Sequence, residues 1–168
     1  MKNIVVAYDR DNAIGREGEL PWAGQLPADM KRFRELTTND TVIMGRKTFE
    51  SLPDNYRPLP NRQNIVLTMG SLAANGFEVA HSLDEAYSLA RNEEIHIIGG
   101  GQIYAAAIDT VDRIYATEID TVVENADAYF PLISQDEWVS SEQQTFAADE
   151  KNKFGYSFLT YLRNHPIQ

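Results

Sequence analysis

The sequence predicts an α/β fold. We expect a single domain over residues 1–168, with a central, mixed but mostly parallel sheet of about eight strands, helices on its faces and an antiparallel C-terminal hairpin. Short runs rich in Val and Ile alternate with helical patterns until Arg113, where the rhythm changes. No repeat, low-complexity tract or linker-like segment divides the chain, and 168 residues are too few for two ordinary domains.

Four short apolar runs are predicted to be buried strands. Each run is continuous rather than alternating, which is typical of strands that are covered on both faces of a parallel sheet. Ligands of such sheets bind in the crevice at the carboxyl ends of the strands. The predicted parallel strands cover residues 4–8, 41–44, 64–68 and 94–98.

Helical patterns lie between these runs. Pro27 stands at a favoured first-turn position, and Ser82 with Glu85 forms a capping-box pattern. The predicted helices cover residues 28–36, 47–52, 82–91 and 102–108. Beyond Arg113, residues 113–119 and 156–162 have strand patterns with no convincing helix between them, so we expect antiparallel pairing there.

The composition narrows the classes of function. A net charge of −10 disfavours nucleic acid and anionic membranes as partners, since their phosphates would repel most of the surface. No apolar stretch approaches the ~20 residues that span a bilayer, and the N-terminal segment has the pattern of a strand rather than a signal peptide. The chain has no Cys, and its three His residues are scattered, so we expect a soluble cytoplasmic protein without a metal site.

Two glycine segments are candidate phosphate sites. Gly99, Gly100 and Gly101 follow a buried strand and precede a helix, and Gly45 stands between a strand and Arg46, Lys47 and Thr48. Glycines let a ligand approach the backbone, and a helix start offers free N–H groups to an anion. Each segment alone could be a plain tight turn. Neither is a Walker A or GxGxxG sequence, but two such sites together indicate a dinucleotide.

Asp29 is the candidate acid. It shares the apolar stripe of its helix with Phe33 and Leu36 at i+4 and i+7, while Lys31, Arg32, Arg34 and Glu35 are expected to point elsewhere. Asp29 could simply complement the helix dipole in the first turn. It could instead be a carboxylate in an apolar cleft, where burial raises its pKa, the dipole lowers it, and a cationic or amidine-like ligand pairs with it.

Three aromatic residues allow two interpretations each. Trp22 lies in the Gly-rich and charged segment 12–24, where it could belong to a loop that closes over a site or could pin that loop to the core. Tyr104 is either a cleft residue beside the glycines or an ordinary core aromatic. His96 alternates within a strand and is expected to be a core residue whose polar atoms find partners.

Together these residues form a pattern that resembles the dihydrofolate reductase family. The matches run in the family's order along essentially the whole chain. They fall at residues 14–15, 20–22, 26–29, 33, 42–46, 48–51, 57–60, 62–67, 97–101, 103–104, 117, 119–120, 127 and 130–131. The resemblance implies an oxidoreductase of one-carbon metabolism that uses NADPH to reduce dihydrofolate for tetrahydrofolate biosynthesis.

The resemblance also implies roles for single residues. Asp29 would accept hydrogen bonds from the pterin edge, supported by Thr117, and would assist protonation at N5 through a water near Trp22. Leu20 and Tyr104 complete the implied catalytic set. Arg62 would hold the α-carboxylate of the substrate, with Arg57 as a neighbouring contact. The implied substrate contacts are Val5, Val6, Asp29, Met30, Phe33, Leu52, Arg57, Leu59, Arg62, Ile98 and Thr117.

The implied NADPH contacts fall into three groups. Those at the nicotinamide are Ala7, Ile14, Gly15 and Tyr104; those at the pyrophosphate are Thr48, Gly100, Gly101, Gln102 and Ile103; and Arg46 and Lys47 would bind the adenosine 2′-phosphate. The further implied contacts are Gly45, Leu67, Thr68, Met69, His81, Ile98 and Gly99. Many members have Ser or Arg where this chain has Thr68, and some have Arg at Gln102, so preference for NADPH over NADH depends mainly on Arg46 and Lys47.

The resemblance further implies a monomer that antifolates inhibit, and a mobile lid over residues 12–24 that Asp127 steadies. Two alternatives are weighed against it. A related reductase, such as the pyrimidine reductase of riboflavin synthesis, would share the glycine sites but would not need Asp29 or Arg62. A non-catalytic nucleotide-binding module would not need Asp29, Trp22 and Tyr104 together.

Overall fold

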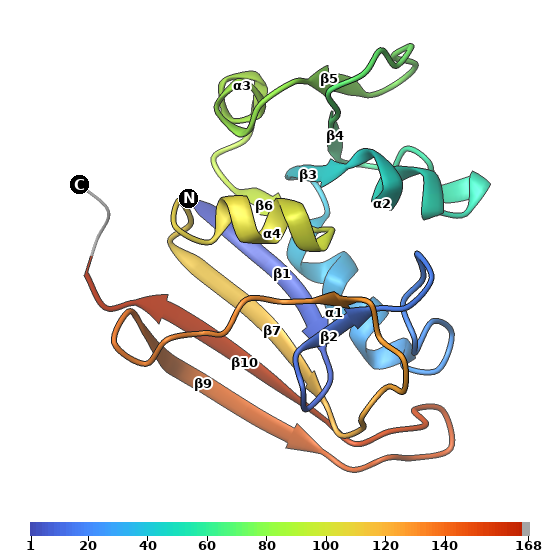
Figure 1. Cartoon of the computed structure of the whole chain (residues 1–168), viewed down its shortest axis with the longest axis vertical. Helices are drawn as coiled ribbons and strands as arrows, with labels where there is room; N and C mark the ends of the chain where they lie inside the picture. The colour runs from blue at the N-terminus through green and yellow to red at the C-terminus, as the bar shows by residue number, and fades with distance from the viewer. Residues whose placement is uncertain (166–168) are drawn as a thin grey trace.

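A computed structural model describes residues 1–165 and contains the predicted central sheet (Figure 1). The sheet has eight strands in the order β5-β4-β3-β6-β1-β7-β10-β9. Its strands are β1 (Lys2–Tyr8), β3 (Thr41–Gly45), β4 (Gln63–Leu67), β5 (Glu78–Ala80), β6 (Ile95–Ile97), β7 (Arg113–Ile119), β9 (Trp138–Phe146) and β10 (Tyr156–Arg163). The predicted fold class is confirmed.

The sheet is mixed in the way the sequence predicts. Strands β5, β4, β3, β6, β1 and β7 pair in parallel, and β10 runs antiparallel to both β7 and β9. In the C-terminal part, Ala116 of β7 pairs with Leu159 of β10, and Thr117 pairs with Phe158. The sequence prediction missed β9, because eight of its nine residues are exposed and show no apolar pattern.

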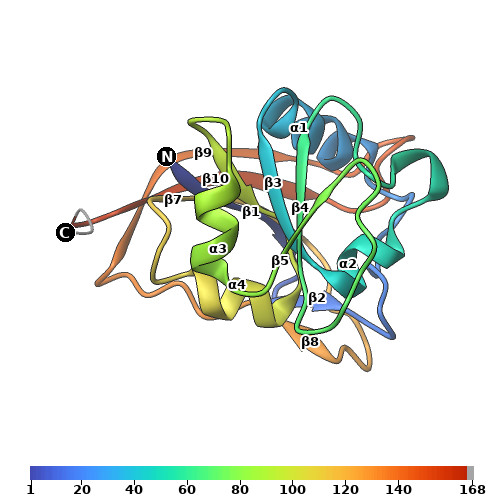
Figure 2. The same cartoon turned by 90° about the horizontal axis from the view of Figure 1, so that it is seen from above.

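Among the described residues, four α-helices cover the sheet: α1 (Pro27–Thr37), α2 (Arg46–Ser51), α3 (Leu83–Leu89) and α4 (Gly101–Ala107). A short 3-10 helix, η1 (Asp54–Tyr56), follows α2. Figure 2 shows α1 on one side of the sheet and α3 and α4 on the other. Ser82 caps α3 as predicted, accepting the Glu85 N–H at 3.0 Å, but α3 ends at Leu89, two residues earlier than expected.

The core lies on both faces of the sheet. Side chains of β1, β3, β4 and β6 pack with α3 and α4 in the largest hydrophobic cluster, in which the Phe130 ring contacts Tyr8 and Tyr104. On the other face, Val42, Met44 and Val66 pack with Phe49 of α2 and Phe33 of α1. Within residues 1–165, no helix is long and apolar enough to cross a membrane.

The predicted lid begins as a strand. Residues 13–15 form β2 (Ala13–Gly15), which pairs with β8 (Ala128–Tyr129) in a separate two-stranded sheet. The buried Asp9 carboxylate accepts N–H groups from Asp11, Ala13 and Val123, and the Asp127 carboxylate accepts the Glu17 N–H at 2.9 Å. Through Asp9 and Asp127, these bonds attach residues 13–17 to the chain between β7 and β8.

Candidate active site

The two glycine segments meet at one place. Strand β6 lies between β1 and β3, so the loop after β6 runs beside the end of β3. The Gly45 N–H donates to the Gly99 carbonyl at 2.8 Å, and the Ile98 N–H donates to Ile43 at 2.9 Å. The helices α2 and α4 therefore start next to each other, and the two predicted phosphate sites form a single site.

The backbone at this place tolerates little besides glycine. A Cβ at Gly100 would lie 3.3 Å from Thr48 Oγ1, and one at Gly45 would lie 3.1 Å from Ile103 Cγ1. Gly99 has a φ of +133°, which L side chains rarely adopt. Neither helix start has a side-chain cap. The result is a narrow cradle of backbone N–H groups beside the Thr48 hydroxyl, which fits a phosphate-bearing ligand.

Several residues predicted for the adenosine end of the cofactor also come together. Arg46 donates to Glu50 at 2.6 Å and to the Ser71 carbonyl at 3.3 Å, so its guanidinium lies along the 68–71 loop. His81 contacts the Thr68 carbonyl through Nδ1 at 2.8 Å. Lys47, Gln102 and Met69 are exposed around this group.

Asp29 lies in the first turn of α1 with its carboxylate against β7. The Thr117 hydroxyl donates to Asp29 Oδ1 at 2.7 Å. Burial raises the pKa of Asp29 above its ordinary value, while the Thr117 hydrogen bond and the charge of Arg32 act to lower it. The side chain keeps intermediate exposure, so this carboxylate is surrounded by protein yet accessible from the cleft.

Tyr104 lies near Asp29 and is hydrogen-bonded to the central strand β1. Its hydroxyl donates to the Val5 carbonyl of β1 at 2.8 Å, and the ring is buried against Phe130. Burial raises the pKa of Tyr104, and the nearby negative charge of Asp29 raises it further. The predicted catalytic residues Asp29 and Tyr104 therefore lie close together, Tyr104 as a neutral hydrogen-bond donor.

Trp22 and the lid strand border the same region. Trp22 is 3% exposed and packs with Leu26 and Ala7, while Leu20 is 48% exposed on the same loop. Among the described residues, none accepts the hydrogen bond of the buried Trp22 Nε1. Ile14 lies close to the cradle, since a Cβ at Gly101 would be 3.6 Å from Ile14 Cδ1.

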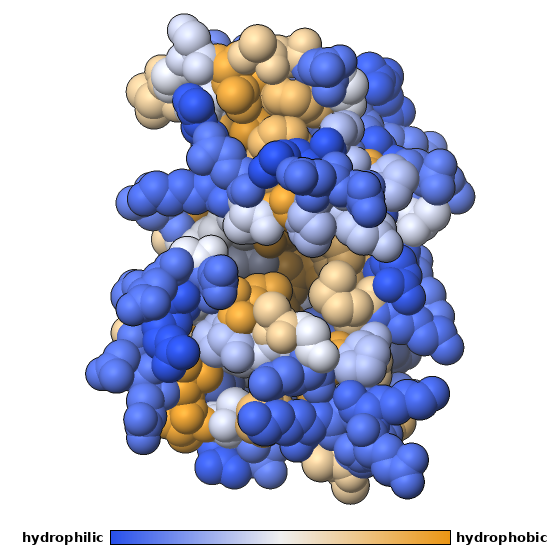
Figure 3. Space-filling view, turned by 90° about the vertical axis from the view of Figure 1, so that its right-hand side faces the viewer, coloured by the Kyte–Doolittle hydropathy of each residue, from blue (hydrophilic) through white to orange (hydrophobic). Residues whose placement is uncertain are grey.

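The predicted substrate pocket has apolar walls on α1 and α2. Phe33, Leu52, Leu59 and Ile98 belong to one hydrophobic cluster that joins α1, α2 and the end of β6. Figure 3 shows this end of the sheet as a hollow whose floor is hydrophobic. Of the other predicted pocket residues, Val5 is partly buried, Met30 is 45% exposed, and Val6 is buried in the opposite core cluster, where only its main chain can contact a ligand in the pocket.

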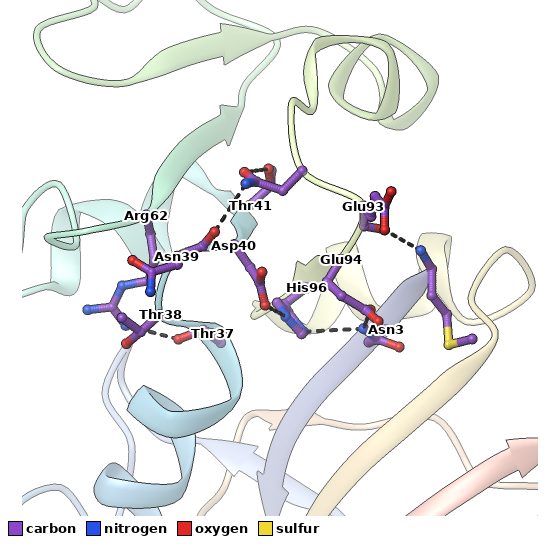
Figure 4. Close-up of polar contacts among 12 residues, drawn as sticks. Asn3, Thr37, Thr38, Asn39, Asp40, Thr41, Arg62, Glu93, Glu94 and His96 are labelled. Carbon is purple, nitrogen blue, oxygen red and sulfur yellow. Dashed lines mark hydrogen bonds and ion pairs between the residues drawn. The ribbon is translucent and has the colours of Figure 1, made fainter.

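The two arginines predicted to bind the substrate differ in their contacts. Arg62 donates to the Thr37 hydroxyl at 2.9 Å (Figure 4) and to the Pro60 carbonyl at 2.9 Å. Its Cζ lies 5.8 Å from the Phe33 ring centroid. Burial and the charge of Arg34 lower the pKa of Arg62. Arg57 is instead paired with Asp54 at 2.8 Å, so only Arg62 is fixed against a pocket aromatic.

One sequence expectation is wrong. Arg32 does not point away from the site: it is partly buried, and its Nη1 donates to the Ala116 carbonyl at 2.8 Å and lies 3.4 Å from Thr117 Oγ1. The i+3 spacing from Asp29 puts both side chains on neighbouring faces of α1, a signal that the apolar stripe obscured. His96 is a core residue as expected, with Nε2 2.9 Å from Asp40 and Nδ1 3.4 Å from Asn3 (Figure 4).

No pattern in the sequence indicated a role for Asn152. Its buried side chain comes from the loop between β9 and β10, 124 residues away, and its Oδ1 accepts the Ala28 N–H of α1 at 3.0 Å. It thereby satisfies one of the free N–H groups at the start of the helix that carries Asp29.

Comparisons with known proteins agree with this geometry. The family model for dihydrofolate reductase matches residues 1–163. The type 3 dihydrofolate reductase of Salmonella typhimurium is 42% identical over 163 residues, covering 96% of this chain and 97% of that protein. The Bacillus subtilis dihydrofolate reductase is 41% identical over 169 residues, covering 98% of this chain and 96% of that protein.

A solved structure is similar over the same extent. The dihydrofolate reductase of Enterococcus faecalis, complexed with NADP(H) and RAB-propyl, superposes with a TM-score of 0.86 at 37% identity, covering 98% of this chain and 97% of that one. The family model, the full-length identities and the shared fold lead to one conclusion. This chain belongs to the dihydrofolate reductase family.

Proposed function

We propose that this chain reduces 7,8-dihydrofolate to tetrahydrofolate with NADPH. The observation that carries the proposal is the pairing of Asp29 and Thr117 at the base of an apolar pocket, beside a glycine cradle suited to a dinucleotide. A phosphate cradle alone would serve many nucleotide-binding proteins. The desolvated carboxylate between the cradle and Arg62 is what selects a pterin substrate with a carboxylate tail.

The chain's own residues account for substrate binding. An ionised carboxylate is well suited to two parallel N–H donors, which is the arrangement of the pterin's amide and amino groups. Thr117 fixes one Asp29 oxygen and leaves the other side of the carboxylate for the ligand. Phe33, Leu52 and Ile98 supply apolar walls, and Arg62 stands at the end where the substrate's α-carboxylate would bind.

The cofactor sites follow the cradle. When bound, NADPH supplies the hydride that C6 of the pterin accepts. Thr48 and the backbone of Gly100 and Gly101 would hold its pyrophosphate, and Arg46 would hold the adenosine phosphate beside Thr68. Further contacts are proposed at the nicotinamide from Ala7, Ile14, Gly15 and Tyr104, at the pyrophosphate from Gln102 and Ile103, and around the adenosine from Lys47, Leu67, Met69 and His81.

The protein's contribution to the chemistry is positioning and proton supply. The raised pKa of Asp29 keeps a proton near N5 at a higher pH than an ordinary carboxylate would. Trp22 and Leu20 lie on the segment that would cover the reacting atoms and exclude water. We therefore expect the rate of hydride transfer to fall as pH rises, because the proton needed at N5 becomes scarcer.

Finer features of the function are proposed on the same basis. Antifolates with a protonated diaminopyrimidine ring would bind Asp29 through the same bidentate pairing, with a positive charge in place of the neutral pterin edge. We also propose that the chain is a single domain, works as a monomer and acts in the cytoplasm. Light scattering during size-exclusion chromatography tests the monomer directly.

The deciding experiment follows NADPH absorbance after dihydrofolate is added to purified protein, with NADH run in parallel. Fast oxidation of NADPH and slow oxidation of NADH are expected. If the folded protein binds NADPH but oxidises neither cofactor with dihydrofolate, the assigned reaction is wrong and a binding module or another reductase is favoured.

A further inference from the structure

The side chain of Arg32 occupies an unusual place for an arginine. It leaves α1 one turn after Asp29 and enters the space between the helix and the sheet. Its Nη1 donates to the Ala116 carbonyl of β7 at 2.8 Å, and its Nη2 donates to the Leu159 carbonyl of β10 at 3.4 Å. These two residues are direct partners in the β7–β10 register, so one guanidinium spans the pair.

Packing holds the guanidinium in this position. Its Cζ lies 4.5 Å from the centroid of the Phe158 ring and 5.9 Å from that of Tyr115. Burial lowers the pKa of Arg32, and the negative charge of Asp29 acts in the opposite direction. An arginine pKa starts so high that the group stays charged, so a fixed positive charge stands beside the candidate catalytic acid.

The hydroxyl of Thr117 connects the two charged groups. It lies 3.4 Å from Arg32 Nη1 and 2.7 Å from Asp29 Oδ1. Arg32 can only donate and an ionised Asp29 can only accept, so the direction of both contacts is fixed. The Thr117 proton goes to Asp29, and the Thr117 lone pair faces Arg32. The polarity of this chain strengthens the bond that orients the carboxylate.

We propose that Arg32 is a positioning residue of this active site, which acts through Thr117 to orient the Asp29 carboxylate and keeps a compensating positive charge beside it. The proposal rests on the proposed reductase function. It assigns Arg32 no contact with substrate or cofactor. Its effect is to make Asp29 easier to ionise than burial alone would allow.

Other charged and titratable groups face this pair. The charge of Asp29 raises the pKa of Tyr104 of α4, and Tyr115 of β7 and Glu142 of β9 raise the pKa of Arg32. On its outer side Arg32 lines a cavity of about 530 Å³, whose other charged lining residues are Lys31, Glu35 and Glu142. Neutralising Arg32 thus removes the one basic group that affects the pKa of Asp29 in this structure's described residues.

The test compares Arg32→Met, which removes the charge, with Arg32→Lys, which keeps it. Lys31→Met is the matched control, because Lys31 is exposed on the same helix and lines the same cavity. The first readout is the ¹³C shift of the Asp29 carboxyl against pH in the protein without ligands, assigned with Asp29→Asn. We expect the midpoint to rise by about half a unit to one unit in Arg32→Met, as for loss of a nearby opposite charge, and to return towards wild type in Arg32→Lys.

The second readout is the pH profile of single-turnover hydride transfer. The falling limb should move to higher pH in Arg32→Met by the same amount, the KM for dihydrofolate should rise about three- to tenfold, and NADPH affinity should stay within about twofold. In a Thr117→Val background, Arg32→Met should raise the KM by a smaller factor, because the hydroxyl that connects Arg32 to Asp29 is already absent. If Arg32→Met does not fold, Arg32→Gln keeps a donor for the Ala116 carbonyl and removes the charge.

Unchanged midpoints and profiles in folded Arg32→Met, or additive effects in the Thr117→Val background, would show that Arg32 only packs against the sheet. Failure of the proposed function looks different. In that case the wild type does not oxidise NADPH with dihydrofolate, while the carboxyl titration still reports whether Arg32 acts on Asp29.

Discussion

Replacing Asp29 with Asn tests the centre of the site most directly. The side chain keeps its shape and its place against Thr117, but it loses the negative charge and turns one acceptor into a donor. The amide NH₂ of Asn then faces a second donor. This donor is either the pterin edge or the Thr117 hydroxyl, which in the wild type donates to Asp29 at 2.7 Å. The substitution therefore changes pairing without leaving a cavity.

The size of the effect can be worked from these contacts. Hydrogen bonds to charged groups contribute about 1.5 to 3 kcal/mol each, and the pterin edge offers two. Losing the pair costs about 3 to 5 kcal/mol of transition-state stabilisation, which corresponds to a fall of roughly a hundred- to a few thousand-fold in kcat/KM near neutral pH. The fall should lessen at low pH, where solvent can protonate the substrate.

Stability should change in the opposite direction. Burial raises the pKa of Asp29 in the folded state, so the fold favours the protonated acid. Its contribution to stability is present below the unfolded-state pKa and is lost as pH rises through the higher folded-state pKa. Asn cannot ionise. The variant should therefore lose less stability than the wild type across that pH range, and at neutral pH its free energy of unfolding should be equal or higher.

The assay combines single-turnover hydride transfer, NADPH binding by fluorescence and urea unfolding at several pH values. Asp84→Asn is the matched control, because Asp84 also lies in the first turn of a helix but is exposed and far along the chain from the cleft. A parallel loss of NADPH binding, or a hydride-transfer rate within tenfold of wild type at neutral pH, would refute the role assigned to Asp29.

The remaining predictions concern three residues. Arg62→Gln should raise the KM for dihydrofolate by about tenfold or more, the value of one charge-assisted hydrogen bond, and should have no effect on a pteroate substrate that lacks the glutamate; equal effects on both substrates would contradict an α-carboxylate contact. Arg46→Gln should weaken NADPH binding about tenfold and leave NADH binding unchanged in titrations, so an equal loss for both cofactors would exclude a 2′-phosphate contact. Asn152→Ala should lower the free energy of unfolding by about 1 to 2 kcal/mol, the usual cost of losing a helix cap, and an unchanged urea midpoint would show that the Ala28 N–H needs no protein partner.

The sequence predicted the parts of the fold that hydrophobic burial determines. The strands that became β3 and β4 consist almost entirely of buried residues, and their continuous apolar runs reflect cover on both faces. Strand β9 has one buried residue, Trp138, and an exposed, mostly polar remainder. Its structure therefore depends on backbone pairing with β10, which leaves no periodic pattern in the sequence. Helix α3 was predictable from its Ser82 cap, because the capping pattern involves only residues that are close together in the sequence.

The same distinction applies to the site. The glycine segments were predictable because each has its own strand, turn and helix start, although their convergence at Gly45 and Gly99 required the strand order. Asp29 was predictable from its place on the apolar stripe. The position of Arg32 was not predictable. The apolar stripe shows which face of α1 is buried, but it does not show that β7 and β10 extend far enough under the helix to bind a residue beside the stripe. Asn152 was hidden for a simpler reason, its separation from α1 along the chain.

The late position of β10 in the chain has a consequence for synthesis. Asp29 is made early, yet the Asn152 cap on α1, the Phe158 ring against Arg32 and the Leu159 carbonyl that Arg32 binds are all made much later than α1. A nascent chain that has reached only the end of β7 already holds Thr117 and the Ala116 carbonyl, but it still lacks the Asn152 cap, the Phe158 ring and the Leu159 carbonyl. The surroundings of the acid are therefore complete only once β10 has paired with β7.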